Sequence, residues 1–119
     1  MTNSQIQALT GMVSDSNKTP RMGSFRTPRR ILRIHVEVLE AFNSDGGDTL
    51  EIGHADDPDA YCTSIDVSST GVKSVTLGSG VNYDAVSRAV IATYAAGGSA
   101  PTTGAVDICI EWIQSPKQP

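Results

Sequence analysis

The segment ILRIHVEVLEAF, residues 31–42, decides the fold class of this chain. Its side chains alternate between apolar and polar with a period of two, as in a strand with one buried face. Arg33, His35 and Glu37 occupy the polar face. The predicted inward face carries four apolar residues, Leu32, Ile34, Val36 and Val38. Beyond Val38 the alternation slips, which predicts a β-bulge or the end of the strand.

The end of the chain repeats this pattern. Asp107, Cys109 and Glu111 are predicted to face outward, and the intervening positions are predicted to face the core, namely Val106, Ile108, Ile110 and Trp112. Tyr94 is predicted to be a core residue as well. The outer faces of these two strands carry mixed charge, which suits either solvent or a polar subunit interface. Opposite charges on paired strands would support each other by about 0.2–1 kcal/mol.

Shorter strands are predicted between these two, at residues 49–54, 61–67, 72–77 and 89–95. Residues 43–48 and 97–104 are rich in turn-forming residues, and each is predicted to close a hairpin. Residues 55–60 are predicted to be a further loop, and 81–86 remain unassigned. With six or seven strands and no long helical pattern, the predicted fold is all-β, an antiparallel β-sandwich or jelly roll.

Charge divides the chain near residue 30. Residues 31–119 contain four cations and twelve acidic residues, for a net charge of −8. Residues 1–30 carry +4, since Asp15 is their one acidic residue against five cations, Lys18, Arg21, Arg26, Arg29 and Arg30. Pro20, Gly23 and Pro28 interrupt regular structure there. We therefore predict an extended basic N-terminal arm at 1–29, disordered when free, and a sandwich domain at 30–119 with a polar tail at 115–119.

Several classes of protein are disfavoured by composition. No stretch approaches the roughly 20 apolar residues of a membrane span, and the polar N-terminus is unlike a signal peptide, so we expect a cytoplasmic protein without membrane contact. Cys62 and Cys109 are the only two cysteines, and we expect them to be free rather than paired.

No residue pattern points to catalysis or to a cofactor. His35 lies on an exposed strand face, and His54 has no evident catalytic partner. The acidic loops contain Asp45, Asp48, Asp56, Asp57 and Asp59, but they lack the spacing of a helix-loop-helix calcium site and suit turns better. We therefore expect no enzyme activity, no metal and no cofactor.

The basic arm is the candidate binding element. Its cations could contact nucleic acid, yet the acidic domain would repel a polyanion, so docking on an acidic protein surface is favoured. The expected contact residues are Arg21, Phe25, Arg26, Arg29 and Arg30.

A resemblance adds a biological context. Residues 41–43 read AFN, 49–53 read TLEIG, and 56–61 read DDPDAY, with Asp45-Gly46-Gly47 forming the turn between the first two. This run, and the strand 104–112 after a Gly-rich loop, resembles small structural proteins of tailed bacteriophages over roughly residues 30–114. Members of that group are capsid decoration (cement) proteins, head fibres and tail-associated modules.

The resemblance implies a sandwich that oligomerises, often as a trimer, and binds the virion shell. The expected function is therefore a capsid decoration protein, assembled in the host cytoplasm into the virion, whose partner is the major capsid protein. The alternative is a tail or fibre module that reads a host glycan or protein through the loops 43–48, 55–60 and 97–104. A phage enzyme or nucleic-acid binder is the third possibility.

Overall fold

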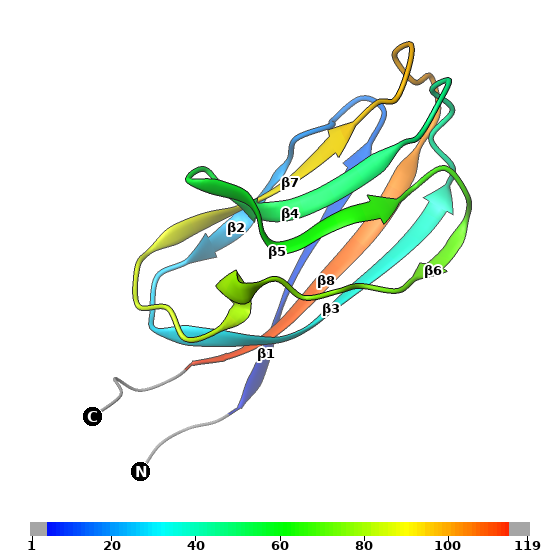
Figure 1. Ribbon diagram of the computed structural model, residues 1–119. Coiled ribbons are helices and arrows are strands. Elements are labelled where there is room, and N and C mark those ends of the chain that lie inside the picture. The colour runs from blue at the N-terminus through cyan, green and yellow to red at the C-terminus, as the bar shows by residue number, and fades with distance from the viewer. Residues whose placement is uncertain (1–4, 115–119) are drawn as a thin grey trace.

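The computed structural model describes residues 5–114 as two antiparallel four-stranded sheets packed face to face (Figure 1). In strand order, the first sheet contains β1 (Ile6–Ser14), β8 (Ala105–Gln114), β3 (Arg29–Glu40) and β6 (Gly71–Lys73). The second contains β2 (Arg21–Phe25), β7 (Arg88–Ala95), β4 (Thr49–His54) and β5 (Asp57–Asp66). We call them the β1 sheet and the β2 sheet. One short 3₁₀ turn, η1 (Ser79–Val81), lies between β6 and β7.

The strand pairs are nested along the chain. β1 pairs with β8, β2 with β7, β3 with β6, and β4 with β5, all antiparallel. Pairs β3–β8 and β4–β7 then join these ladders into two sheets. An eight-stranded double sheet with this nesting is a jelly roll, so the predicted all-β sandwich is confirmed, with eight strands instead of six or seven.

Inward side chains from both sheets form one core. Ile34, Val36 and Val38 of β3 are buried as predicted, as are Val106, Ile108 and Ile110 of β8 and Tyr94 of β7. Trp112 is half-buried and packs edge-to-face on Phe25, with ring centroids 5.1 Å apart. Phe42 stacks on Tyr94 at 4.2 Å and closes the opposite end of the core.

The start of β3 differs from the predicted alternation. The register with β8 shifts between Ile31 and Arg33, so Ile31 is buried and Leu32 is only half-buried. A bulge places two residues opposite one, which turns the side chains of one strand segment to the other face. The second shift, between Val38 and Glu40, confirms the slip predicted there.

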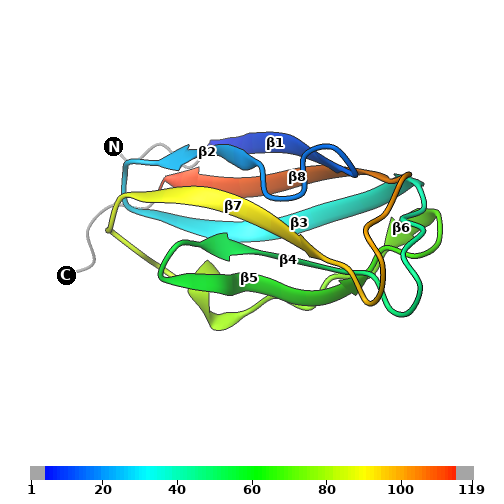
Figure 2. The ribbon, with the colours of Figure 1, turned by 90° about the horizontal axis from the view of Figure 1, so that it is seen from above.

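The predicted free N-terminal arm is wrong for the residues that the structure describes. β1 and β2 are edge strands of the two sheets and lie side by side (Figure 2). Their inward side chains Val13, Met22 and Phe25 are buried in the common core. Gly11 permits this approach, because a Cβ there would lie 2.6 Å from Cγ of Met22. Residues 1–4 of the proposed arm and the tail at 115–119 lie outside the described residues.

The two predicted hairpins at 43–48 and 97–104 are also wrong. Each of these segments crosses from one sheet to the other, because β3 and β8 belong to the β1 sheet while β4 and β7 belong to the β2 sheet. The loop expected at 55–60 is mostly strand: β5 begins at Asp57, which pairs with His54 across a two-residue turn. Nested pairing, in which sequence neighbours often lie in different sheets, has no signature in local composition.

Candidate functional site

The five residues predicted to contact a partner lie at one end of the sandwich, where β2 ends and β3 begins. The structure divides them into two groups. Phe25 is 1% exposed and Arg29 is 2% exposed, so neither can touch a partner without unfolding of this end. Arg21, Arg26 and Arg30 are exposed. The prediction that Phe25 and Arg29 are contact residues is therefore wrong, and both are structural.

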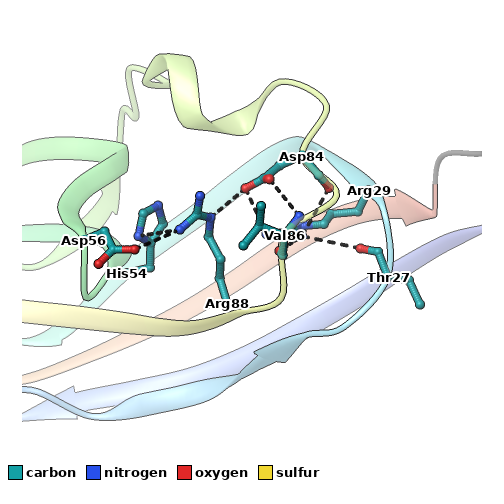
Figure 3. A network of polar contacts seen from close by, with 7 residues as sticks. All are labelled: Thr27, Arg29, His54, Asp56, Asp84, Val86 and Arg88. Carbon is teal, nitrogen blue, oxygen red and sulfur yellow. Dashed lines mark hydrogen bonds and ion pairs between the residues drawn. The ribbon is translucent and has the colours of Figure 1, made fainter. Parts of the chain in front are cut away.

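Arg29 is the centre of a polar network (Figure 3). Its guanidinium lies 3.3 Å from Asp84 Oδ2 and donates to three backbone carbonyls, those of Thr27, Asp84 and Val86. The backbones of Arg29 and Asp84 also exchange two hydrogen bonds of 3.1 Å each. The same guanidinium lies 4.8 Å from the centre of the Phe25 ring, in cation–π geometry. These contacts tie the β2–β3 corner to the segment before β7.

The network continues through Arg88 to the β4–β5 turn. Asp84 accepts a 2.7 Å hydrogen bond from Nε of Arg88, and Nη1 of Arg88 lies 3.3 Å from Asp56 and 3.5 Å from Nδ1 of His54 (Figure 3). Burial alone would raise the pKa of Asp84, but hydrogen bonds from Arg88 and the Val86 N–H, with the charge of Arg29, hold it below its usual value. Burial, with the charge of Arg88, lowers the pKa of His54. His54 therefore binds a proton less readily than an exposed histidine does.

Next to this network the surface is hollowed. An open depression of about 450 Å³ is lined by Arg21, Ser24, Phe25, Arg26, Ser87, Arg88 and Ala89. We call it the arginine groove. Arg21 donates a 2.7 Å hydrogen bond to Ser24 Oγ, and Arg26 has no hydrogen-bond or ion-pair partner within residues 5–114. A smaller hollow beside His54 shares Arg88 and Ala89 with it.

The outer face of the β1 sheet carries the charge pairs expected from the sequence. Arg33 lies opposite Glu111, and Nε of Arg33 donates a 2.5 Å hydrogen bond to its carboxylate. His35 Nε2 lies 3.3 Å from the same carboxylate, and hydrogen bonds from Arg33 and His35 lower the pKa of Glu111. Glu37 and Asp107 are cross-strand neighbours of like charge, which weakens the pairing slightly. This face is therefore mixed in charge.

The acidic residues of the loops do not gather at one place. Asp48 is 1% exposed and accepts a hydrogen bond from the Tyr94 hydroxyl at the end far from Arg29, while Asp56 and Asp57 belong to the β4–β5 turn. Asp45 is exposed. Within residues 5–114, no group of three or more His, Cys, Asp or Glu side chains is arranged to hold a metal ion.

The three loops proposed as a reading surface also lie apart. Segments 43–48 and 97–104 meet at one end, where Asn43 and Thr102 exchange two hydrogen bonds of 2.8 Å and Ser44 Oγ accepts one from the Gly97 N–H. The 55–60 segment begins at the opposite end, beside Arg88 (Figure 1). A single surface made by all three loops is therefore excluded.

Both cysteines are free, as predicted. Cys62 is buried in β5, and burial raises the pKa of its thiol to about 12. Cys109 is half-buried in β8, in the other sheet. In the described part of the chain, no helix is both long and apolar enough to cross a membrane.

Sequence reasoning missed two central residues of this end, Asp84 and Arg88. Asp84 lies in the 81–86 segment that showed no clear period, and Arg88 immediately precedes a predicted strand. Their importance depends on β7 pairing with β2, a contact between residues 63 to 70 positions apart in the chain. A buried arginine at position 29 would have indicated that an acidic partner lies nearby. Burial of this corner was not predicted from the sequence, so the partner was missed.

Comparison with known proteins gives a shared fold. No family model and no curated protein matches the sequence. Among solved structures, a chain of the cyanophage Pam1 capsid asymmetric unit is similar, with a TM-score of 0.71, 16% identity, and coverage of 94% of this chain and 86% of that one. A chain of the acidic stable capsid of Helicobacter pylori bacteriophage KHP30 has a TM-score of 0.64 and 9% identity, covering 98% and 92%. A chain of the capsid of Ralstonia phage GP4 has a TM-score of 0.63 and 14% identity, covering 97% and 86%.

Proposed function

We propose that this chain is a bacteriophage capsid decoration (cement) protein, which binds the shell of the virion head and stabilises it. The observation that carries the proposal is the whole-chain fold similarity to chains of three phage capsid structures. The match covers at least 86% of each of those chains, so the neighbours are themselves small chains of about this size. A separate, small jelly roll suits a protein added to a shell.

The surface of the molecule supports a binding role. The arginine groove and the hollow beside His54 are open depressions lined in part by charged side chains, and the ionisable groups of the Arg29 network pair with one another. The function is mechanical: a bound chain adds contact area to the assembled shell and shifts the equilibrium toward assembly by mass action. We propose no enzymatic reaction, no cofactor, no nucleic-acid partner and no membrane partner for this chain. Its proposed location is the virion.

We also propose a homotrimer. An oligomer that carries several copies of one weak binding site binds with avidity. The oligomer therefore stays bound to the shell even though each site is weak. Light scattering with the purified full chain tests this part separately. A mass of three chains supports it, and a monomer at concentrations that saturate shells contradicts it.

The direct test is co-sedimentation with shells assembled from the major capsid protein encoded in the same genome. Saturable binding at a fixed ratio of chains to shell subunits supports a decoration role. Binding to isolated tails or to a host-cell glycan array, with none to shells, would favour the tail or fibre alternative and contradict the proposal.

A further inference from the structure

The arginine groove holds positive charge that no acidic side chain of residues 5–114 neutralises. Arg88 is paired with Asp84 and Asp56. Within the described residues, Arg26 has no hydrogen-bond or ion-pair partner, and the side chain of Arg21 donates to the neutral hydroxyl of Ser24. A carboxylate pairs with a guanidinium through two parallel hydrogen bonds, so an acidic partner would neutralise both side chains.

Contacts within the protein hold two of the lining residues in place before any partner binds. Phe25 is 1% exposed, and the centre of its ring lies 4.8 Å from the Arg29 guanidinium. Arg88, on its border, is fixed at Nε by Asp84 and at Nη1 by Asp56. A preformed wall loses little entropy on binding, so more of the interaction energy appears as affinity.

The groove runs along β2 and the start of β7, because its lining residues come from both strands and from Ser87 just before β7. β2 is an edge strand, and β1 of the other sheet lies beside it. Arg21 is the first residue of β2, and Arg26 directly follows its last residue. An extended segment that runs along β2 in the groove would therefore pass both exposed arginines.

The chemistry of the surroundings favours separate carboxylates over a run of phosphates. Asp56 is 86% exposed and lies within ion-pair distance of Arg88, and residues 31–119 carry a net charge of −8. A nucleic acid laid along this surface would bring its phosphates close to Asp56 and to a domain of net negative charge. A short peptide with one or two acidic side chains can place them on Arg21 and Arg26 and avoid Asp56.

From these observations we propose that the arginine groove binds an extended acidic segment of a protein partner, with its carboxylates on Arg21 and Arg26. The inference deepens the proposed function and rests on it, since the shell protein would supply the segment. Arg21 and Arg26 thus bind the partner, whereas Arg29 and Phe25 hold the groove in place.

The first test measures binding of a fluorescein-labelled hexaglutamate peptide to the full chain by fluorescence anisotropy. The double variant R21Q/R26Q should bind at least about tenfold more weakly, because each lost guanidinium removes a charge-assisted hydrogen-bonding pair. The matched control K18Q/R33Q removes the same charge from two exposed side chains that do not line the groove and should change the affinity less than about twofold. Equal loss in both variants, or no binding by the unmodified chain, would overturn the inference.

The second test repeats shell co-sedimentation with the same two variants. Loss of binding in R21Q/R26Q but not in K18Q/R33Q supports the groove. If the unmodified chain fails to bind shells, the proposed function fails; if it binds and R21Q/R26Q binds equally well, only the groove assignment fails. Stronger binding of a labelled single-stranded DNA hexamer than of hexaglutamate, lost in R21Q/R26Q, would overturn the choice of an acidic protein segment.

Discussion

The guanidinium of Arg29 lies 3.3 Å from the carboxylate of Asp84, and the two residues also exchange a pair of backbone hydrogen bonds. Arg29 begins β3, and Asp84 lies four residues before Arg88, where β7 begins. A contact across 55 positions thus closes one end of the jelly roll. This contact explains why Arg29 is buried although it lies in a basic segment: Asp84 is its counter-ion, and the pair is structural.

Replacing Arg29 by Met should destabilise the protein by about 3 kcal/mol, because Asp84 and three backbone carbonyls lose their common donor. Urea unfolding followed by tryptophan fluorescence measures this loss, since Trp112 packs on Phe25 beside the site. The control Arg30→Gln changes an exposed neighbour and should stay within about 0.5 kcal/mol of the unmodified protein. Equal effects of the two substitutions would show that Arg29 is not structural.

Deletion of residues 1–25 should abolish cooperative folding. The deletion removes both edge strands β1 and β2 and the buried side chains of Val13, Met22 and Phe25, each of which contributes on the order of 1.5–3 kcal/mol. Circular dichroism with a thermal scan measures the outcome. If residues 1–25 were instead a free arm, the truncated chain would still fold cooperatively. A truncated chain with an unchanged melting curve would therefore contradict the fold described here.

Tyr94→Phe should cost about 1–3 kcal/mol, because the buried carboxylate of Asp48 loses the hydroxyl that donates to it. The other oxygen, Oδ2, already has no partner within residues 5–114, so the substitution leaves both side-chain oxygens unsatisfied. Tyr83→Phe removes a hydroxyl from a half-buried tyrosine and serves as the control. A cost for Tyr94→Phe no larger than that of the control would contradict a role for this hydrogen bond.

His54 should make stability sensitive to mild acid. Burial and Arg88 lower its pKa below 6.5, so between its folded and unfolded pKa values the unfolded chain binds more protons. The free energy of unfolding should therefore fall as pH drops through about 6.5 and level off below the folded pKa. Unfolding in urea at pH 8, 7, 6 and 5 measures this slope for the unmodified protein and for His54→Gln. The slope should be smaller in the variant, and an identical slope would assign the effect to other groups.

The features predicted correctly from the sequence are those that depend on the local alternation of apolar and polar residues. The long strands near 31–42 and 105–112, most of their inward residues and the mixed charge of their outer faces follow from a period of two. The N-terminal strands could not be recognised because Gly11 and Gly23 stand where apolar residues would have completed the pattern. Gly11 makes room for Met22, and Gly23 has a φ of +149° at the bulge of β2.

The positive charge near residue 30 indicated where the candidate site lies, but it did not show which of the arginines there are exposed. Composition drew attention to the arginines near residue 30, yet it could not distinguish Arg29 from Arg26 or Arg30. That distinction depends on Asp84, which reaches Arg29 only because β7 pairs with β2 and β3 turns away into the other sheet. Long-range contacts of this kind decide which charges are buried and which remain for a partner.

The measurement that tests the central claim most directly is the temperature at which shells come apart, recorded by scanning calorimetry with and without the full chain. A decoration protein binds the assembled form and not the dissociated one, so the disruption temperature should rise with added chain and stop rising when the shell sites are filled. Shells that bind the chain at saturation and still come apart at the same temperature would contradict a stabilising role.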